Sequence, residues 1–472
     1  MSLFFGVVAV LGALVLGYFV LLNAVYLALT GVALLSLRKY AGRLKALDVA
    51  DVLLLGGAPP VTLIAPAYNE EATCVQSVRS LLALEYADYE VLVVNDGSKD
   101  STLATLIAAF DLVPAVRAPT AEIPTKGAVR QVYRSRHRPG LWVLDKANGG
   151  KADALNAGLN HVRTPLFCAI DADSLLEREA LSRIVRPFLE DDRTVAAGGI
   201  IRIANGCEVQ GGMVTKVGLP KSLLARIQVV EYLRSFLAGR VGWDALGATL
   251  IISGAFGMFK RATVVAAGGY DHTTVGEDME LVVRLHRHCR ERGIPYRVAF
   301  AADPVAWTEC PESLSVLGRQ RSRWQRGLSE VIWRHRGMLF RPRYGVLGLV
   351  AMPYFLLLEV LGPVIEAAGY LIFFLTLVVG SWHGDWALAF LVLAFALGMA
   401  LSLAAIGLEE LTFRRYPRLR QLLDLMGVAV IEAVGYHQLS TWWRLKGTWA
   451  ALRQRGGWGE MTRKGFGTAP AR

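Results

Sequence analysis

The chain has 472 residues, 53% of them hydrophobic, and a formal net charge of +11. This length holds one large folded domain together with several membrane helices, and the hydrophobic share is high for a purely soluble chain. The basic balance does not indicate nucleic acid, because many Lys and Arg residues stand beside apolar segments, where anionic lipid headgroups are the expected partner. These basic stretches are 334–343, 414–420 and 444–464.

The first apolar segment, residues 1–37, is longer than the roughly 20 residues that a bilayer span requires, so it predicts a transmembrane helix. A basic cluster follows it at Arg38, Lys39, Arg43 and Lys45. A secretory signal has its basic residues before the apolar run, which is the opposite order. By the positive-inside rule, the cluster places the next domain in the cytoplasm.

From Val61 onward, short apolar runs alternate with amphipathic stretches. Strands are expected at 61–66, 90–96, 141–145 and 165–171, and helices from near Glu70, Ser101 and Lys151. This alternation predicts an α/β domain with a parallel sheet covered on both faces. Ligands of such sheets bind beyond the carboxyl ends of the strands, where Asn69, Asp96, Asp145 and Asp171 are expected.

Later segments complete the predicted organisation. A Gly-rich strand near 195–203, an amphipathic stretch at 223–240 and a helix opened by acidic residues near 277 precede apolar segments at 346–380 and 386–408. A third segment, 421–443, either spans the membrane or lies at its interface. The predicted domains are a transmembrane helix at 1–37, a cytoplasmic domain at 38–340, transmembrane and interfacial helices at 341–447, and a basic cytoplasmic tail at 448–472.

Two carboxylates one residue apart, Asp171 and Asp173, end the strand PLFCAID. Such a pair can hold Mg²⁺ or Mn²⁺, which prefers oxygen ligands shared with substrate phosphates. The metal would neutralise charge on a leaving nucleoside diphosphate. Alternatively, Asp173 caps the next helix.

Asp96 and Lys151 strengthen the phosphate hypothesis. Asp96 ends a neighbouring strand at a tight turn, where it could hydrogen-bond a nucleotide base or ribose. Lys151 follows two glycines at a helix start, so its ammonium and the free backbone N–H groups can attract phosphate. Each residue alone is also explained by turn or cap chemistry.

A sugar transfer that displaces the diphosphate needs a base for the acceptor hydroxyl, and Asp278 in GEDMEL is the predicted base. Its alternative role is that of an acidic residue favourable at a helix N-terminus. A basic and aromatic motif follows, with Gln320, Arg321, Arg323 and Trp324. Arg323 could contact diphosphate oxygens and Trp324 could stack on a sugar ring, although a lipid-facing basic helix also explains the arginines.

NDGS, GGKADALN, DAD, GED and QRSRW in this order resemble the processive, membrane-integrated, inverting family 2 glycosyltransferases, which include cellulose, hyaluronan, chitin and poly-N-acetylglucosamine synthases. The shorter amino-sugar polymerases are the most similar type. The resemblance implies a nucleotide-sugar transferase A-type, Rossmann-like fold and a UDP-sugar donor. It assigns Asp96 and Lys151 to the nucleotide, Asp171 and Asp173 to the sugar diphosphate and metal, and Asp278 to the base. Gln320, Arg321, Arg323 and Trp324 would line the acceptor and diphosphate site.

Two further segments resemble parts of these enzymes. The tail GGWGEMTRKGF is similar to a gating segment, so Trp458, Thr462 and Arg463 would close over the nucleotide, which requires a cytoplasmic C-terminus. The segment Ser253–Phe256 is similar to one that contacts the acceptor sugar, or is an ordinary buried strand. The match departs from several relatives in having one predicted span, rather than two, before the catalytic domain.

Three functions compete. The leading one is a polymerase in the cell (inner or plasma) membrane that extends a β-linked polysaccharide from UDP-N-acetylglucosamine and helps translocate it. Acidic residues within apolar segments, Glu359, Glu366 and Glu432, fit a polar path or an interfacial position. The runner-up transfers one sugar to a membrane lipid, and a catalytically idle membrane receptor is the alternative of another class.

Overall fold

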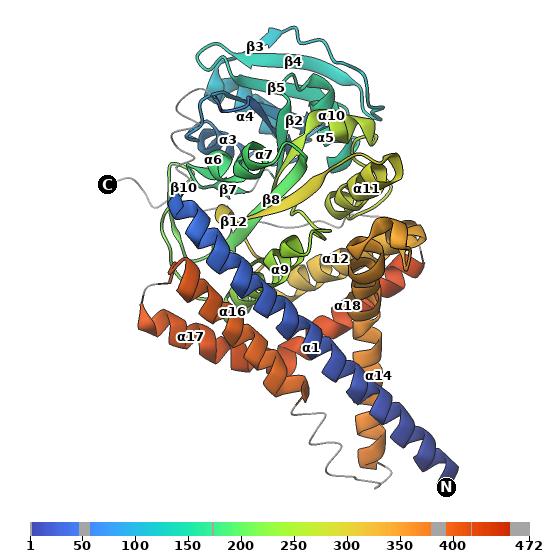
Figure 1. Cartoon of the computed structure of the whole chain (residues 1–472). Helices are drawn as coiled ribbons and strands as arrows, with labels where there is room; N and C mark the ends of the chain where they lie inside the picture. Colours follow the sequence, from blue (N-terminus) through green and yellow to red (C-terminus); the bar gives the residue numbers. More distant parts are fainter. Residues whose placement is uncertain (1, 47–56, 172–173, 379–392, 417, 454–472) are drawn as a thin grey trace. The chain divides into compact units, whose positions relative to one another are not determined.

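The structure is a computed structural model that describes residues 2–46, 57–171, 174–378, 393–416 and 418–453. These residues form two compact units (Figure 1). The sheet unit contains Lys39–Pro220 and Leu246–Cys310, and the helical unit contains Met1–Arg38, Lys221–Ala245 and Pro311–Met461. This grouping differs from the predicted domains, because segments 221–245 and 311–340 belong with the apolar helices rather than with the sheet.

The sheet unit has one ten-stranded sheet with the order β3-β4-β5-β2-β1-β6-β11-β8-β12-β7. Strands β5, β2, β1 and β6 are parallel neighbours, as the sequence predicted, whereas β3, β4, β7 and β11 are antiparallel to their neighbours. The strands are β1 (Val61–Ala67), β2 (Tyr89–Asp96), β3 (Leu112–Ala115), β4 (Val129–Ser135), β5 (Leu141–Lys146), β6 (Leu166–Ile170), β7 (Leu175–Leu176), β8 (Thr194–Ile203), β11 (Phe256–Lys260) and β12 (Arg297–Thr308). A separate hairpin pairs β9 (Glu208–Gln210) with β10 (Met213–Lys216).

Both faces of this sheet are covered. Successive residues of a strand point to opposite faces, and the neighbours Leu63 and Ile64 are both fully buried. The helices of the unit are α3 (Cys74–Leu81), α4 (Thr102–Phe110), α5 (Lys151–His161), α6 (Ala180–Ile184), α7 (Arg186–Glu190), α10 (Arg261–Ala266) and α11 (Glu277–Arg292). Helix α3 begins at Cys74 rather than near Glu70, because Thr73 and Cys74 first close a turn back onto the carbonyl of Glu70.

Helix α5 lies very close to the sheet, which places its first residue at the site. A Cβ on Gly158 would lie 2.6 Å from Ile64 Cγ2 of β1, so a larger residue would push the helix outward. Buried Leu155 and Leu159 of α5 join Ile64, Leu92 and other strand residues in one core.

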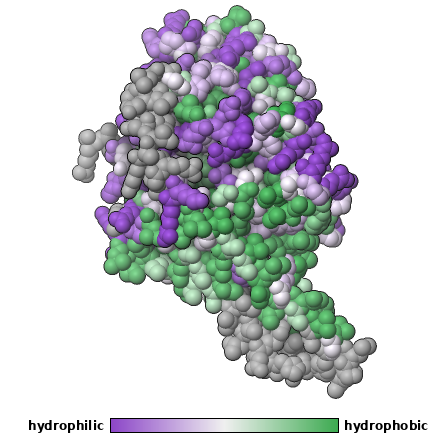
Figure 2. Space-filling view, viewed as in Figure 1, coloured by the Kyte–Doolittle hydropathy of each residue, from purple (hydrophilic) through white to green (hydrophobic). Residues whose placement is uncertain are grey.

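The helical unit consists of α1 (Ser2–Ala46), α8 (Leu223–Tyr232), α9 (Val241–Ala245), α12 (Leu314–Arg334), α13 (Met352–Tyr354), α14 (Gly362–Val378), α16 (Gly398–Thr412), α17 (Leu419–Ile431) and α18 (His437–Leu452). Shorter helical segments join them: η2 (Leu233–Arg240), η3 (Arg336–Met338), η4 (Pro342–Tyr344), η5 (Leu347–Ala351), η6 (Phe355–Val360), η7 (Leu393–Leu397) and η8 (Glu432–Tyr436). The face drawn in Figure 2 is mostly hydrophobic over these helices. Within the described residues, four helical stretches are long and apolar enough to cross a membrane: Gly6–Tyr40, Leu347–Phe374, Phe395–Thr412 and Leu419–Leu452.

The last of these stretches is interrupted. Val434 and Gly435 have non-helical backbone angles, which separates α17 from α18. At 1.5 Å per residue, the two helices are about 20 and 24 Å long, so each is shorter than a hydrocarbon core of about 30 Å. The segment 421–443, whose placement the sequence left open, therefore forms parts of two shorter helices joined at a kink.

The three acidic residues expected at a polar path or at the interface, Glu359, Glu366 and Glu432, are all paired with other side chains inside the helical unit. Glu366 and Glu432 are buried, which argues against their exposure at the interface. The contacts are Glu359 with Arg444 at 3.0 Å and Tyr26 at 2.6 Å, Glu366 with His437 at 2.9 Å and Thr441 at 2.8 Å, and Glu432 with Arg234 at 2.7 Å.

Candidate functional site

Lys151 joins three segments of the sheet unit. Its Nζ lies 2.5 Å from Asp171 Oδ1, just after β6, and 3.3 Å from Glu277 Oε1, at the start of α11. Burial lowers the pKa of this ammonium, but the two carboxylates outweigh burial and raise the pKa above its ordinary value. The structure thus brings together Lys151 and Asp171, as the sequence predicted, and adds Glu277.

Glu277 was missed by the sequence reasoning, which took the neighbouring Asp278 from the same GED motif. Glu277 is buried, and burial raises its pKa although the nearby ammonium of Lys151 opposes the shift. The sequence signal that could have identified Glu277 is the pair of adjacent acidic residues at the helix start. Neighbouring side chains of a helix point in different directions, so either of the two can face the site.

Asp278 lies beside the same lysine. The backbone N–H of Gly254 donates to Asp278 Oδ2 at 3.0 Å, which orients the carboxylate. A Cβ on Gly254 would lie 2.9 Å from Lys151 Nζ and 3.5 Å from Asp278 Oδ2, so a side chain at this position would displace the ammonium of Lys151. The segment Ser253–Phe256 is therefore more than a buried strand, because β11 begins only at Phe256 and the preceding loop contacts the predicted base.

A small cavity of about 10 Å³ lies among these groups, with room for about one water molecule. Polar and apolar side chains share its wall. The lining residues are Lys151, Leu155, Ala169, Ile170, Ile252, Ser253, Gly254, Phe259, Tyr270, Glu277 and Asp278.

Asp96 is buried, and the carboxylate is engaged within the chain. It accepts hydrogen bonds from the N–H of Gly149 at 3.0 Å and of Gly150 at 2.8 Å, and from the side chains of Asn148 and Lys146. Asp96 thus holds the loop that leads into α5. The two glycine N–H groups are therefore bound to Asp96, while phosphate binding at the start of α5 and a contact between Asp96 and a nucleotide stay predictions.

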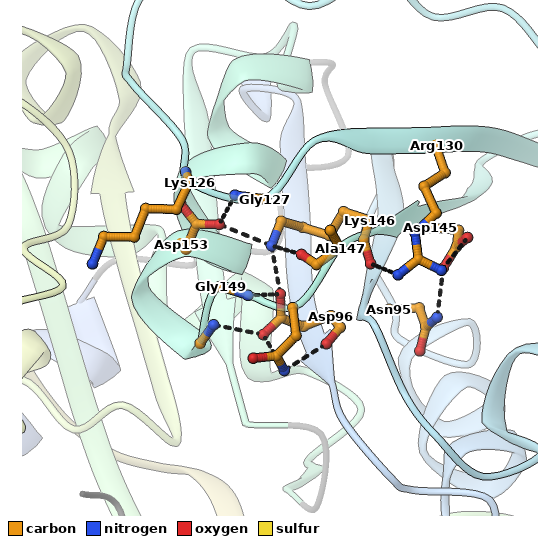
Figure 3. A network of polar contacts seen from close by, with 12 residues as sticks. Asn95, Asp96, Lys126, Gly127, Arg130, Asp145, Lys146, Ala147, Gly149 and Asp153 are labelled. Atoms are coloured by element: carbon orange, nitrogen blue, oxygen red, sulfur yellow. Dashed lines mark hydrogen bonds and ion pairs between the residues drawn. The ribbon is translucent and has the colours of Figure 1, made fainter.

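Lys146 and Asp153 form a buried ion pair that the sequence reasoning missed. Figure 3 shows the lysine between Asp96 and Asp153. Asp153 also accepts from the backbone N–H groups of Lys126 at 2.6 Å and Gly127 at 3.0 Å. Burial raises the pKa of Asp153, but the hydrogen bonds from Lys146, Lys126 and Gly127 outweigh burial and hold the pKa below its ordinary value. Lys146 is the last residue of the largely apolar strand β5, and this position is a sequence signal of an inward-pointing charge.

Asp145, the remaining acidic residue at a strand end, has a structural role. It accepts a hydrogen bond from Asn95 Nδ2 at 2.7 Å and lies 3.7 Å from Arg130 Nη1. Asn69 likewise accepts from the N–H of Lys99 at 2.9 Å in a surface turn. Strand-end position alone therefore does not make either residue part of the cavity.

The residues of QRSRW belong to α12 in the helical unit. Arg321 pairs with Glu231 at 2.6 Å, and its guanidinium lies 4.4 Å from the centre of the Trp324 ring. Gln320 is buried, while 43% of Trp324 is exposed. Arg321 thus has a structural partner, and the acceptor roles of Gln320, Arg321, Arg323 and Trp324 stay predictions. Asp173, Trp458, Thr462 and Arg463 lie outside the described residues.

The sheet, its cavity at the strand ends and the flanking apolar helices define a class: an α/β domain of the nucleotide-sugar transferase A type, as the sequence predicted. Residues 59–327, more than half of the chain, match the family model described as "Glycosyltransferase like family 2". The chain therefore belongs to this family, and the predicted enzyme class, glycosyltransferase, is confirmed.

Two curated relatives carry the name poly-β-1,6-N-acetyl-D-glucosamine synthase. The protein of Staphylococcus aureus (strain COL) is 28% identical over 275 residues, and that of Staphylococcus epidermidis is 26% identical over the same length. Each alignment covers 58% of this chain and 56% of the relative, so the chain spans about half the length of these relatives. The predicted similarity to the poly-N-acetylglucosamine synthase type is confirmed.

Among solved structures, a mannosyltransferase from Pyrobaculum calidifontis in complex with GDP-Man and Mn²⁺ aligns with a TM-score of 0.48 and 18% identity, over 92% of this chain and 100% of that chain. Glucosyl-3-phosphoglycerate synthase from Mycobacterium tuberculosis in complex with Mn²⁺, UDP and phosphoglyceric acid aligns with a TM-score of 0.34 and 17% identity, over 57% and 78% of the two chains.

Proposed function

We propose that the protein is an inverting, processive glycosyltransferase that polymerises a β-linked amino-sugar polysaccharide from UDP-N-acetylglucosamine and helps translocate it across the membrane. The observation that carries the proposal is one cavity lined by Lys151, Glu277 and Asp278, with Asp171 paired to the same lysine. The relatives named as poly-β-1,6-N-acetyl-D-glucosamine synthases support the donor and the polymer.

The charges of the site suit transfer from a nucleoside diphosphate sugar. Lys151 supplies one ammonium among three carboxylates, and a diphosphate would draw it away from Asp171. Asp278 is only partly buried and is oriented through Gly254, so it can accept the proton of an acceptor hydroxyl. Attack by that hydroxyl on the anomeric carbon expels the nucleoside diphosphate and inverts the configuration at that carbon.

We propose that Asp171, at the end of β6, is a ligand of Mg²⁺ or Mn²⁺. The Asp171 side chain is 31% exposed there and offers hard carboxylate oxygens, which these ions take together with substrate phosphates and water. Asp173 would be the second ligand. When bound, the ion neutralises charge on the leaving diphosphate.

The other predicted residues complete the proposal. Asp96 would contact the uridine at the loop before α5, which it holds. The exposed ring of Trp324 would offer an apolar face to the acceptor sugar, and Gln320, Arg321 and Arg323 would lie beside that sugar. Trp458, Thr462 and Arg463 would close over the bound nucleotide.

The membrane arrangement follows from the helical stretches. We infer one crossing by α1 and two by the stretches Leu347–Phe374 and Phe395–Thr412, with α17 and α18 at the interface. Two crossings after the catalytic domain return the C-terminus to the cytoplasm, in agreement with its basic residues.

The test uses the purified chain in nanodiscs with Mn²⁺ and radiolabelled UDP-N-acetylglucosamine or UDP-glucose, followed by sizing of the product. High-molecular-weight product from UDP-N-acetylglucosamine supports the proposal, and full activity in excess chelator contradicts the metal role. A single labelled lipid would identify a lipid transferase instead. Nucleotide binding without turnover would identify an idle receptor.

A further inference from the structure

Tyr270 carries a buried hydroxyl that has no hydrogen-bond partner among the described residues. The residue is 3% exposed, and its Oη has no donor or acceptor within range. Folded proteins rarely leave such a group unpaired, because an unsatisfied buried hydroxyl costs about 1–3 kcal/mol. A side chain of this kind in a cavity wall points to a ligand.

The backbone of Tyr270 is held firmly. The side chain of Asn156, from α5, donates to the carbonyl of Tyr270 at 2.8 Å and accepts from its N–H at 2.7 Å. One residue earlier, the guanidinium of Arg284, from α11, donates to the carbonyl of Gly269 at 2.6 Å. Two helices therefore fix the turn that positions the phenol, as a preorganised contact requires.

The charged groups of the site influence the phenol. Tyr270 lines the same cavity as Lys151, Glu277 and Asp278. Burial raises the pKa of the phenol, Lys151 opposes this shift, and the two carboxylates add to it. The phenol therefore keeps its proton at neutral pH and can donate a hydrogen bond.

The surroundings limit what this hydroxyl can bind. Glu277 and Asp278 line this cavity together with the single ammonium of Lys151, so the cavity offers no surplus of positive charge for an anionic group. Leu155, Ile252 and Phe259 make the rest of the wall apolar. A cavity of about 10 Å³ accepts a neutral group the size of a hydroxyl.

We infer that Tyr270 Oη donates a hydrogen bond to one ring hydroxyl of the sugar being transferred, and that it selects the donor by this contact. The inference rests on the proposed function, because the sugar must lie between Asp171, which would hold the diphosphate, and Asp278, which would activate the acceptor. Tyr270 then acts on the uncharged sugar and not on the nucleotide.

The experiment compares the wild-type chain with Tyr270→Phe, which removes only the hydroxyl. Transfer is measured with UDP-N-acetylglucosamine and with its 3-, 4- and 6-deoxy analogues, and UDP binding is measured by calorimetry. In the wild type, kcat/KM is expected to be about 10- to 100-fold lower for one deoxy analogue, since the donor hydrogen bond is then unmade. Tyr270→Phe is expected to lower kcat/KM for the full donor by a similar factor and to lose discrimination against that one analogue.

The control variant is Tyr86→Phe, which removes a hydroxyl that donates to the carbonyl of Pro59 at 2.7 Å, away from the cavity. It should match the wild type with every donor, and both variants should bind UDP as the wild type does. Unchanged discrimination in Tyr270→Phe overturns the inference. If the wild type transfers none of these sugars, the proposed function fails instead, so the two failures are distinguishable.

Discussion

Lys146 Nζ lies 2.8 Å from Asp153 Oδ2, and neither side chain is exposed to solvent. The same ammonium contacts Asp96, whose carboxylate holds the loop before α5. The positive charge of one buried lysine thus compensates the negative charges of two buried carboxylates, one from β2 and one from α5. The loop that positions Lys151 depends on this compensation.

Lys146→Met should destabilise the sheet unit by about 3–5 kcal/mol, because both aspartates would stay buried without their cation. The apparent unfolding temperature of the purified protein in detergent measures this loss. Lys216→Met is the matched control, since Lys216 pairs with Glu208 where both side chains are largely exposed, and such pairs contribute little. Equal unfolding temperatures for the two variants would contradict the structural role of Lys146.

Asp278→Asn should lower transfer by about 10²- to 10⁴-fold, because the amide cannot take the acceptor proton. The amide oxygen can still accept from Gly254 N–H, so the site should keep its shape and bind UDP normally. Radiolabel transfer and calorimetry separate the two effects. Glu291→Gln on the exposed end of α11 serves as the control, and unimpaired transfer by Asp278→Asn would remove Asp278 from the mechanism.

The sequence predicted the strands and helices around the site well, because buried parallel strands read as continuous apolar runs between amphipathic stretches. It also predicted that Lys151 and Asp171 come together, since both follow strands that end at one edge. It did not predict the partners of buried charges. Asp96 is paired with Lys146 and Asp145 with Asn95, so both aspartates have partners within the chain. These pairings follow from the strand register, which the sequence does not reveal.

Sequence patterns also did not determine the helix break or the polar contacts of the helical unit. Apolar composition marked 421–443 as a segment that spans or lies at the interface, but the break at Val434 and Gly435 depends on backbone angles that composition does not reveal. The partners of Glu432 come from η2 and α16, which are far away in the chain. Long-range pairing of this kind is set by packing rather than by local pattern.

His286 should make the stability of the sheet unit depend on pH. Burial lowers the pKa of this imidazole to about 4, and its two nitrogens lie 2.9 Å from the hydroxyl of Tyr296 and from the carbonyl of Thr249. Between its ordinary pKa of about 6.5 and about 4, the unfolded chain binds the proton and the folded chain does not. Stability is therefore complete above pH 6.5 and is lost as the pH falls toward 4, by on the order of 3 kcal/mol.

Unfolding temperatures recorded from pH 7 to pH 4.5 measure this dependence. His286→Gln cannot be protonated, so its stability should fall less steeply over this range than that of the wild type. His137→Gln replaces a histidine whose side chain is 79% exposed and should keep the wild-type slope. Identical slopes for all three proteins would show that His286 does not govern the pH response.

Arg234 and Glu432 form an ion pair inside the helical unit, with Arg234 Nη2 2.7 Å from Glu432 Oε1 and Ser402 Oγ 3.3 Å from Glu432 Oε2. Arg234→Met should leave the buried carboxylate without its cation and destabilise the unit by about 3 kcal/mol. The double variant Arg234→Met with Glu432→Leu should recover much of this loss, because it removes the unpaired charge together with its partner. Unfolding temperatures in detergent decide between the outcomes. A double variant no more stable than Arg234→Met would mean that the pair acts through something other than charge compensation.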